Sequence, residues 1–511
     1  MSEAELKRPD GDESVEAGVW RYAHAARVGV IVDAENYFAH MQQAMLNAQR
    51  QIMLIGWDFD TRIHLTHGRR WYHRPFNADY PSRLGSFLLW LARNRKELEV
   101  NVLKWGLSFI QLLTRGSMTL DIMRMWPKRQ LNFKFDTKHP IGCSHHQKIA
   151  VLDRKLAVCG GIDMTNDRWD TRSHREEDPR RRQPGGSPYG PWHDITVMME
   201  GDVAVALSDL CQARWVRAGA EPLVEFDPPE ESPWPEKLEV DFENVEIGIA
   251  RTRAEYEGVC AVNEIEELAL KHIKCAKRFI YIENQYFTSR KIAEAIAERL
   301  REEDPPEIVI VHPETAEGWL EQQAMDHARA CLARMLQEVD HKDRFHLFVP
   351  YSGETPIYVH AKLTIVDDEI LRIGSANLNN RSMGLDSESD IFIDCRRDAN
   401  MGKGHEDAIK ALRHSLIAEH CGIDEDAIGD ILDNAKSMTE VIEEFGRRHG
   451  RQLRPFQIPE LNEVEETLAG SQLLDPERPD DMFEPFASGG LFRKGSLLDR
   501  VRKRVKRKEG K

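Results

Sequence analysis

A repeated pattern of reactive residues constrains this chain more than any other feature of its sequence. In each copy a His is followed by a Lys two residues on, an Asp seven on and a Gly fourteen on. The first copy, in SHHQKIAVLDRKLAVCGGIDMTNDRWD, consists of His146, Lys148, Asp153 and Gly160. The second copy, in VHAKLTIVDDEILRIGSANLNNR, consists of His360, Lys362, Asp367 and Gly374. Two copies in fixed register predict two similar halves whose reactive residues meet at one site.

Each copy has the composition of a β-hairpin. Short apolar runs rich in β-branched residues flank Arg154–Lys155 and Asp368–Glu369, which predicts a two-residue turn at each position. This register places Lys148 opposite Gly161, His146 opposite Asp163, Lys362 opposite Ser375 and His360 opposite Asn377. Residues two apart on a strand share a face, so each half is expected to present an imidazole, an ammonium group and a small polar residue together. The glycines would let an anionic group approach the backbone.

Two histidines and two lysines at one point suit phosphoryl transfer. A neutral imidazole can attack phosphorus and form a phosphohistidine. The other imidazole, when protonated, can deliver a proton to the leaving alkoxide and then activate water, for roughly 10²–10⁴-fold in rate. The lysines would hold the non-bridging oxygens. The candidates for substrate contact are Gly161, Asp163, Ser375 and Asn377. A single copy would fit a buried strand with an ordinary histidine equally well.

No metal or other cofactor is expected from these residues. Two ammonium groups can serve the electrostatic role of a cation. The run Cys143–His146 suggests zinc ligands, but no second ligand cluster in the sequence completes such a site.

The two motifs resemble the paired HKD motifs of the phospholipase D superfamily. The phrases GGIDMTNDRWDT, PWHD, IYIENQYF and RSMGLDSE resemble its lipid-hydrolysing, eukaryotic-type branch, over about residues 28–421. The resemblance implies that His146 is the nucleophile and His360 the general acid, a choice that the nearly symmetric motifs leave open. It also implies that Asp153 and Asp367 are structural. It assigns orientation of the imidazoles to the downstream acids Glu388 and Asp194.

Further substrate-binding candidates come from the same resemblance. It places the phrase IENQ beside the site, where Glu283, Asn284 and Gln285 can exchange hydrogen bonds with substrate, although a capped turn fits the sequence equally well. His193 of PWHD is another candidate, with a hydrogen-bonded structural histidine as the alternative. The polar loop 171–190 either covers the site and selects head groups or is a solvated surface loop.

The pattern of elements predicts an α/β fold. A helix over 37–50 leads into a strand over 51–57, and a helix over 264–277 leads into a strand over 278–282. We expect two similar lobes, each a mixed β-sheet flanked by helices, related by pseudo-twofold symmetry. The expected order is a polar tail at 1–26, a first lobe at 27–220, a Pro-rich acidic linker at 221–244, a second lobe at 245–422 and a C-terminal extension at 423–511.

Charge and apolar pattern limit the partners. The net charge of −16 argues against extensive nucleic-acid contact, and eight scattered cysteines fit a reducing compartment. The N-terminal segment lacks the apolar core of a secretory signal, and there is no apolar run of 18 residues. We therefore expect a cytoplasmic protein whose membrane contact is peripheral.

The C-terminal segment Arg493–Lys511 carries ten Lys or Arg against two acids. This composition predicts attraction to an anionic membrane surface, worth up to about 1 kcal/mol per basic residue. A disordered solubilising end and a nucleic-acid arm are the alternatives.

Together with the resemblance, these features predict a monomeric phospholipase D-type phosphodiesterase. It would hydrolyse a glycerophospholipid to phosphatidic acid and a free head group, and an alcohol replacing water would give transphosphatidylation. The alternatives are a cardiolipin-synthase-like phosphatidyltransferase, a superfamily nuclease and a catalytically silent lipid-binding scaffold. Intact His and Lys residues in both copies argue against the scaffold.

Overall fold

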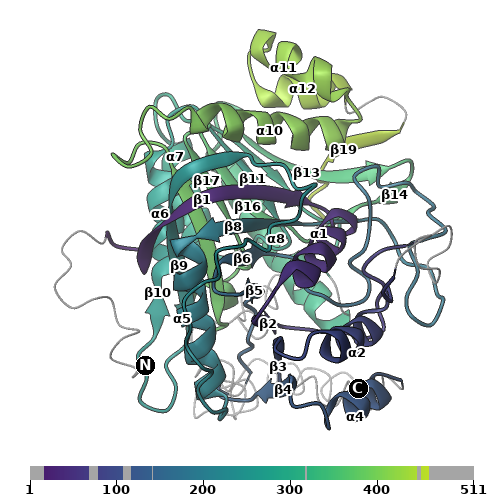
Figure 1. The fold of residues 1–511 in the computed structure, drawn as a ribbon. Coiled ribbons are helices and arrows are strands. Elements are labelled where there is room, and N and C mark those ends of the chain that lie inside the picture. Colours follow the sequence, from purple (N-terminus) through teal and green to yellow (C-terminus); the bar gives the residue numbers. More distant parts are fainter. Residues whose placement is uncertain are drawn as a thin grey trace, which may run out of the picture.

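The strands of the chain form one large mixed sheet with helices packed against it, as the computed structural model shows (Figure 1). The structure describes residues 16–67, 79–106, 117–140, 142–316, 319–445 and 450–459. The predicted α/β class is confirmed. Residues 1–15 of the predicted polar tail and the basic segment Arg493–Lys511 lie outside the described residues.

One strand order occurs twice in this sheet. On one side the order is β4, β3, β2, β5, β6, β8, β1, and on the other it is β13, β12, β11, β16, β17, β18, β9. In each series the first three strands are parallel and the rest antiparallel. Antiparallel pairing of β1 with β9 joins the series, so the halves share a single sheet where separate sheets were expected.

The bounds of the first series are β1 (Arg21–Val32), β2 (Gln51–Gly56), β3 (Glu99–Trp105), β4 (Leu131–Asp136), β5 (Ile149–Leu152), β6 (Leu156–Gly160) and β8 (Ile195–Gly201). Those of the second are β9 (Phe242–Arg253), β11 (Phe279–Asn284), β12 (Glu307–Val311), β13 (Phe345–Ser352), β16 (Lys362–Val366), β17 (Ile370–Gly374) and β18 (Glu388–Asp394). Shorter strands are β7 (Trp192–His193), β10 (Val262–Asn263), β14 (Thr355–Pro356), β15 (Tyr358–Val359) and β19 (Arg451–Pro455).

Helices lie on both halves. Those of the first half are α1 (Ala34–Asn47), α2 (Leu84–Asn94), α4 (Ser117–Met125) and α5 (Asp202–Arg217). Those that follow are α6 (Glu264–Cys275), α7 (Arg290–Leu300), α8 (Trp319–Val339), α9 (Asn380–Gly384), α10 (His405–Cys421), α11 (Glu425–Asn434) and α12 (Met438–Phe445). In Figure 1, α10 crosses the top of the molecule, with α11 and α12 above it.

Alternation along the strands divides the core into layers. In β2, Met53 and Ile55 enter a central core shared with both halves, whereas Ile52 and Leu54 pack against α1 and α2. Successive side chains of a strand point to opposite faces, which makes this division possible. The central layer brings β6 close to β17 and β18, and it therefore places the two hairpins against each other.

The hairpin turns are one residue longer than predicted. Leu152 pairs with Leu156 and Val366 with Ile370, so each loop has three residues and begins at the motif Asp. The predicted two-residue turns are therefore wrong, and the register derived from them is shifted by one residue. The observed pairing of Ile149 with Cys159, continued by one position, sets Lys148 opposite Gly160 and not Gly161.

A hydrogen-bonding role of the motif Asp explains the longer turn. Asp153 has a φ of 54° and accepts hydrogen bonds from the backbone N–H groups of Gln49, Arg50 and Gln51, where α1 leads into β2. Asp367 has a φ of 56° and accepts from Lys277, Arg278 and Phe279 before β11. Asp tolerates this left-handed conformation better than most residues, and three bonds to the carboxylate stabilise it.

The predicted linker has no helix or strand between residues 221 and 241, but it is not detached. Its Trp234 and Leu238 are buried in the core of the first half, and the Nε1 of Trp234 donates to the carbonyl of Leu238. The first half also begins earlier than expected, since β1 starts at Arg21.

Candidate active site

The two motif histidines lie just before β5 and β16, and the backbone of each is hydrogen-bonded to the other half. The N–H of His146 donates to the carbonyl of Ser387 at 2.9 Å, and the N–H of His360 donates to the carbonyl of His193 at 2.7 Å. Parallel pairing of β7 with β15 adds a second link beside His360. The position of each imidazole therefore depends on both halves.

The imidazoles are also oriented by carboxylates that the halves exchange. Nδ1 of His146 lies 3.0 Å from Glu388 Oε1, and Nδ1 of His360 lies 2.7 Å from Asp194 Oδ2. Glu388 lies on β18 and Asp194 immediately precedes β8, the corresponding strand of the first half. Because Nδ1 of each ring faces a carboxylate, Nε2 is the nitrogen left for chemistry.

The two lysines are buried beside these rings but differ in their partners. Lys148 Nζ lies 3.2 Å from the carboxylate of Asp163 and donates to the carbonyl of His146 at 2.9 Å. Lys362 Nζ donates to the amide oxygen of Gln285 at 3.0 Å and to the carbonyl of His360. Burial lowers the pKa of Lys362 to about 7, against the opposing pull of the Asp194 carboxylate.

Burial has a large effect on the acids and bases of this site. It lowers the pKa of both His146 and His360 well below the usual value, and the neighbouring lysines add to the effect. It raises the pKa of Asp194 to about 7 and that of Glu388 to about 8. Neutral imidazoles are the form that can attack phosphorus, and an anionic phosphodiester in the cleft would favour protonation of the second ring.

Both imidazoles line one cleft with a volume of about 510 Å³. Among the predicted substrate-binding residues, Gln285 and Asn377 also line it. Ser375 is buried and donates from Oγ to Glu388, so it supports the carboxylate. Asp163 is buried too and accepts hydrogen bonds from the N–H groups of Trp57 and Asp58 in addition to pairing with Lys148.

The glycine at position 161 makes room for a protein carboxylate. A Cβ on Gly161 would lie 2.1 Å from Asp194 Oδ1, and one on Gly374 would lie 2.0 Å from Asp390 Oδ1. The close approach expected of an anionic ligand is thus made by the protein's own acids.

Three predicted substrate contacts lie away from the cleft. Asn284 accepts the N–H groups of Tyr286 and Leu378 with Oδ1, as the capped-turn alternative predicts. Glu283 is fully buried and lies 2.7 Å from His193 Nε2, also fully buried. Neither Glu283 nor His193 is among the residues that line the cleft.

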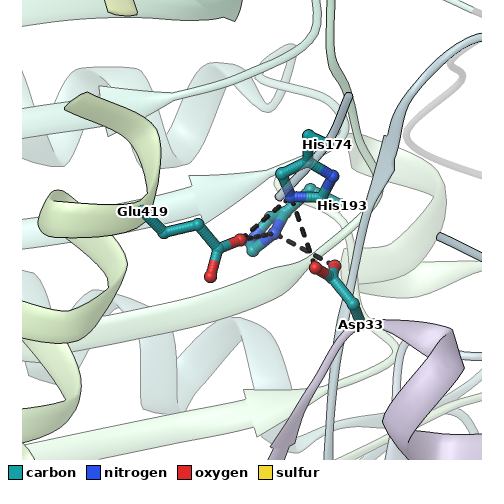
Figure 2. Close-up of side chains that lie close together, drawn as sticks. All are labelled: Asp33, His174, His193 and Glu419. Atoms are coloured by element: carbon teal, nitrogen blue, oxygen red, sulfur yellow. Dashed lines mark hydrogen bonds and ion pairs between the residues drawn. The ribbon is translucent and has the colours of Figure 1, made fainter. Parts of the chain in front are cut away.

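His193 instead belongs to a buried cluster next to the site, with Asp33, His174 and Glu419 (Figure 2). His174 Nε2 lies 2.9 Å from Glu419 and 3.3 Å from Asp33, and His193 Nδ1 lies 3.1 Å from Glu419 and 3.3 Å from Asp33. These separations are close to the roughly 3.3 Å between ligand atoms in a tetrahedral site with bonds of about 2.0 Å.

The cluster can hold either protons or a metal ion. The other nitrogen of each ring faces a carboxylate, His174 with Asp170 at 3.1 Å and His193 with Glu283 at 2.7 Å, as is usual for metal-bound histidines. Without a metal, the protonated rings of His174 and His193 offset the negative charge of the neighbouring carboxylates. Burial opposes protonation of His174, but the carboxylates of Asp33, Asp170 and Glu419 outweigh it and raise its pKa to about 10.

The cluster is hydrogen-bonded to the backbone of Asp194, whose carboxylate orients His360. The N–H of Asp194 donates to Asp33 Oδ1 at 3.2 Å, and the N–H of Asp33 donates to the carbonyl of Asp194 at 2.9 Å. Sequence reasoning missed Asp33, His174 and Glu419, because they are single residues in separate segments. The sequence also did not predict that loop 171–190 is packed against the protein, with the side chains of His174 and Arg181 buried.

Arg168 is another cleft residue that the sequence did not single out. It is 6% exposed, and its guanidinium carbon lies 4.2 Å from the ring centre of Trp192, which itself lies 5.2 Å from His360. Its one hydrogen bond in the described structure is a 3.4 Å contact to the carbonyl of Asp167. Arg168 has no counterpart in the second copy of the motif, where the residue at the same distance from the motif histidine is Ser382.

Comparison with known proteins agrees with this geometry. Residues 44–295 and 321–464, more than half of the chain, match the family model described as phospholipase D. The chain belongs to the phospholipase D family. Among the helices that the structure describes, none combines the length and the apolarity needed to cross a bilayer.

Individual relatives are distant. Phospholipase D A of Dictyostelium discoideum is 24% identical over 427 aligned positions, which cover 71% of this chain and 32% of that protein. Phospholipase D alpha 4 of Arabidopsis thaliana is 24% identical over 506 positions, covering 76% and 64%. The chain thus spans between about a third and two thirds of the length of these relatives. A phosphatidylserine synthase structure from Haemophilus influenzae shares the fold, with a TM-score of 0.53, 11% identity and coverage of 88% and 95%.

Proposed function

We propose that this phospholipase D family member hydrolyses glycerophospholipids to phosphatidic acid and a free head group through a phosphohistidine intermediate. The observation that carries the proposal is the pair of imidazoles in one cleft, each held through Nδ1 by a carboxylate of the other half. This arrangement provides one nucleophile and one proton donor without further groups.

In the first step Nε2 of His146 attacks phosphorus. An N–P bond forms, the bond from phosphorus to the head-group oxygen breaks, and His360 transfers its proton to the departing alkoxide. Asp194 stabilises the imidazolium of His360 before this transfer, as an acid beside a catalytic histidine does in other enzymes. In the second step His360 takes a proton from water, the oxygen attacks phosphorus, and the N–P bond breaks to release phosphatidic acid.

Three groups support the developing charge. Lys148 and Lys362, buried beside the imidazoles, bring positive charge, and Asn377 lines the cleft with the two histidines. Gln285 holds Lys362 by its amide oxygen, so this lysine can turn to a phosphate oxygen without first breaking an ion pair with a carboxylate.

Transfer of the phosphatidyl group is the second candidate. The phosphoenzyme reacts with whichever hydroxyl reaches phosphorus, so an alcohol gives a new phospholipid where water gives phosphatidic acid. The fold shared with a phosphatidylserine synthase favours this candidate over a nuclease, and the curated relatives are named phospholipases D.

The test uses the purified chain with vesicles of phosphatidylcholine, phosphatidylethanolamine or phosphatidylglycerol, in dilute ethanol, with and without EDTA. Phosphatidic acid and phosphatidylethanol are expected with the wild type and not with His146→Ala. His346→Ala, a histidine of β13 outside the cleft, is the matched control and should keep full activity. Cleavage of DNA or an aryl phosphodiester without any lipid product would contradict the proposal.

A trapping experiment tests the assignment of the nucleophile. Acid quenching during turnover of a substrate labelled at phosphorus should leave the label on His146, and His360→Ala should slow its appearance. Label found on His360 would reverse the two roles.

A further inference from the structure

The outer face of α4 carries exposed apolar side chains. Leu120 is 54% exposed, Met123 66% and Trp126 82%, which makes them three of the seven exposed large hydrophobic residues that the described part of the chain holds. Their spacing of three places them along one side of the helix and its C-terminal end. The other four, Val216, Val224, Val240 and Met401, are scattered, which is usual for a soluble surface.

The helix that presents this face is firmly attached. Met118, Ile122 and Met125 on its inner side are buried, with Met118 and Ile122 packed against the side chains of β4. Asp121 accepts hydrogen bonds from Thr61 at 2.7 Å and from Arg83 at 2.6 Å. Both sides of α4 are therefore apolar, and only the inner side has a partner within the described structure.

Positive charge surrounds the exposed face, although the whole chain carries −16. Arg124, Arg129 and Lys134 are exposed, whereas the acids of the same segment, Asp121 and Asp136, are buried and paired with arginines. Apolar side chains within a basic rim are the pattern of proteins that bind the surface of anionic membranes, and Trp favours the interfacial region.

The helix α4 lies in the connection between two strands that reach the cleft. α4 follows β3, whose last residue Trp105 lines the cleft, and precedes β4, whose last residue Asp136 pairs with Trp105. The exposed face thus belongs to the same β3–α4–β4 unit as one wall of the cleft.

We propose that Leu120, Met123 and Trp126, with the rim formed by Arg124, Arg129 and Lys134, dock the protein on an anionic phospholipid bilayer. The inference rests on the proposed function, because a phospholipid substrate is presented in such a surface. Charge favours an anionic bilayer over two other partners for this face. A second copy of the chain would bring the same basic rim, and the C-terminal segment Arg493–Lys511 is itself strongly basic, so both would be repelled.

The test is co-sedimentation with vesicles of phosphatidylcholine alone or mixed with phosphatidylglycerol, in a His146→Ala background that prevents hydrolysis. Binding to the mixed vesicles should be at least about tenfold stronger. The double variant Met123→Ser/Trp126→Ser should lose most of this binding, and Arg124→Glu/Arg129→Glu should lose it for the mixed vesicles. Val224→Ser, which also removes an exposed apolar side chain, is the matched control and should bind as before.

Activity separates the inference from the proposed function. With the catalytic His146 in place, the double serine variant should hydrolyse vesicles at least about tenfold more slowly but a short-chain phosphatidylcholine below its micelle concentration at the wild-type rate. Unchanged vesicle binding in this variant would overturn the inference, as would a lower melting temperature or the loss of a dimer, since these show that the chain itself or a second copy covers the face. If the wild type cleaves no phospholipid, the proposed function fails, whereas sedimentation still decides the docking surface.

Discussion

The protonation of the buried cluster makes a prediction about stability. His174 lies between the carboxylates of Asp33, Asp170 and Glu419, which raise its pKa from 6.5 to about 10 against the effect of burial. A base whose pKa is raised by folding stabilises the folded state fully below its unfolded pKa. This contribution is lost as the pH rises from 6.5 through about 10.

The size of the effect follows from the shift. At 1.36 kcal/mol per pH unit, the change from 6.5 to about 10 corresponds to about 5 kcal/mol of stability from this one residue. The perturbation is His174→Gln, and the quantity compared is the difference in thermal midpoint between wild type and variant in EDTA. This difference should be largest near pH 6.5 and shrink by several degrees toward pH 10.

A second buried histidine gives the control. Burial and Arg329 hold the pKa of His312 well below 6.5, so the effect of His312→Gln should not change over the same pH range. A divalent cation in the cluster would need neutral imidazoles, and its stabilisation would instead grow with pH. Repeating the scans with added Zn²⁺, which fits two imidazoles and two carboxylates, therefore distinguishes the two states. A difference between wild type and His174→Gln that does not vary with pH, with or without metal, would refute the reasoning.

Three further predictions concern the cleft. Asp194→Asn removes the charge that orients His360 and should lower the turnover number by about 10²–10⁴-fold while leaving the melting temperature within a few degrees; an activity within tenfold of wild type would contradict this role. Gly161→Ala places a methyl group 2.1 Å from the same carboxylate and should reduce activity to a similar extent in a protein that still folds by circular dichroism; full activity would show that Asp194 is free to move. Arg168→Gln should weaken hydrolysis of phosphatidylglycerol and phosphatidylserine relative to phosphatidylcholine, because a buried guanidinium without a carboxylate partner in the described structure favours head groups with hydroxyl or carboxylate acceptors; equal loss on all three lipids would instead indicate contact with the phosphate.

Local periodicity and the repeat predicted much of the fold. The helix and strand predicted at 264–277 and 278–282 are α6 and β11 within two residues, and those predicted at 37–50 and 51–57 are α1 and β2 within three residues. The single continuous sheet was not predictable, because the pairing of β1 with β9 joins strands more than 200 residues apart in the chain. Nor was β19, whose five residues carry little strand signal and depend on pairing with β13.

The candidate site, like the fold, was only partly predictable from the sequence. Residues written twice in fixed register, such as His146 and His360, were predictable because the spacing is itself the signal. The turn register was not, since it depends on three backbone N–H groups that reach Asp153 from the connection between α1 and β2, about 100 residues earlier in the chain. Asp33 and Glu419 share a cluster but no local pattern, so only the tertiary structure brings them together.

The exchange of carboxylates has a consequence for how the chain becomes an enzyme. Residues 21–217 contain His146 but not Glu388, and residues 242–421 contain His360 but not Asp194. Each half thus supplies what the other lacks, as the subunits of a twofold dimer do, with a single chain taking the place of two. A newly synthesised first half should therefore have no catalytic activity until the second half has folded against it. A chain cut between residues 221 and 241 should give two fragments that are each inactive alone. Mixing them should restore activity to an extent that rises with the concentration of both.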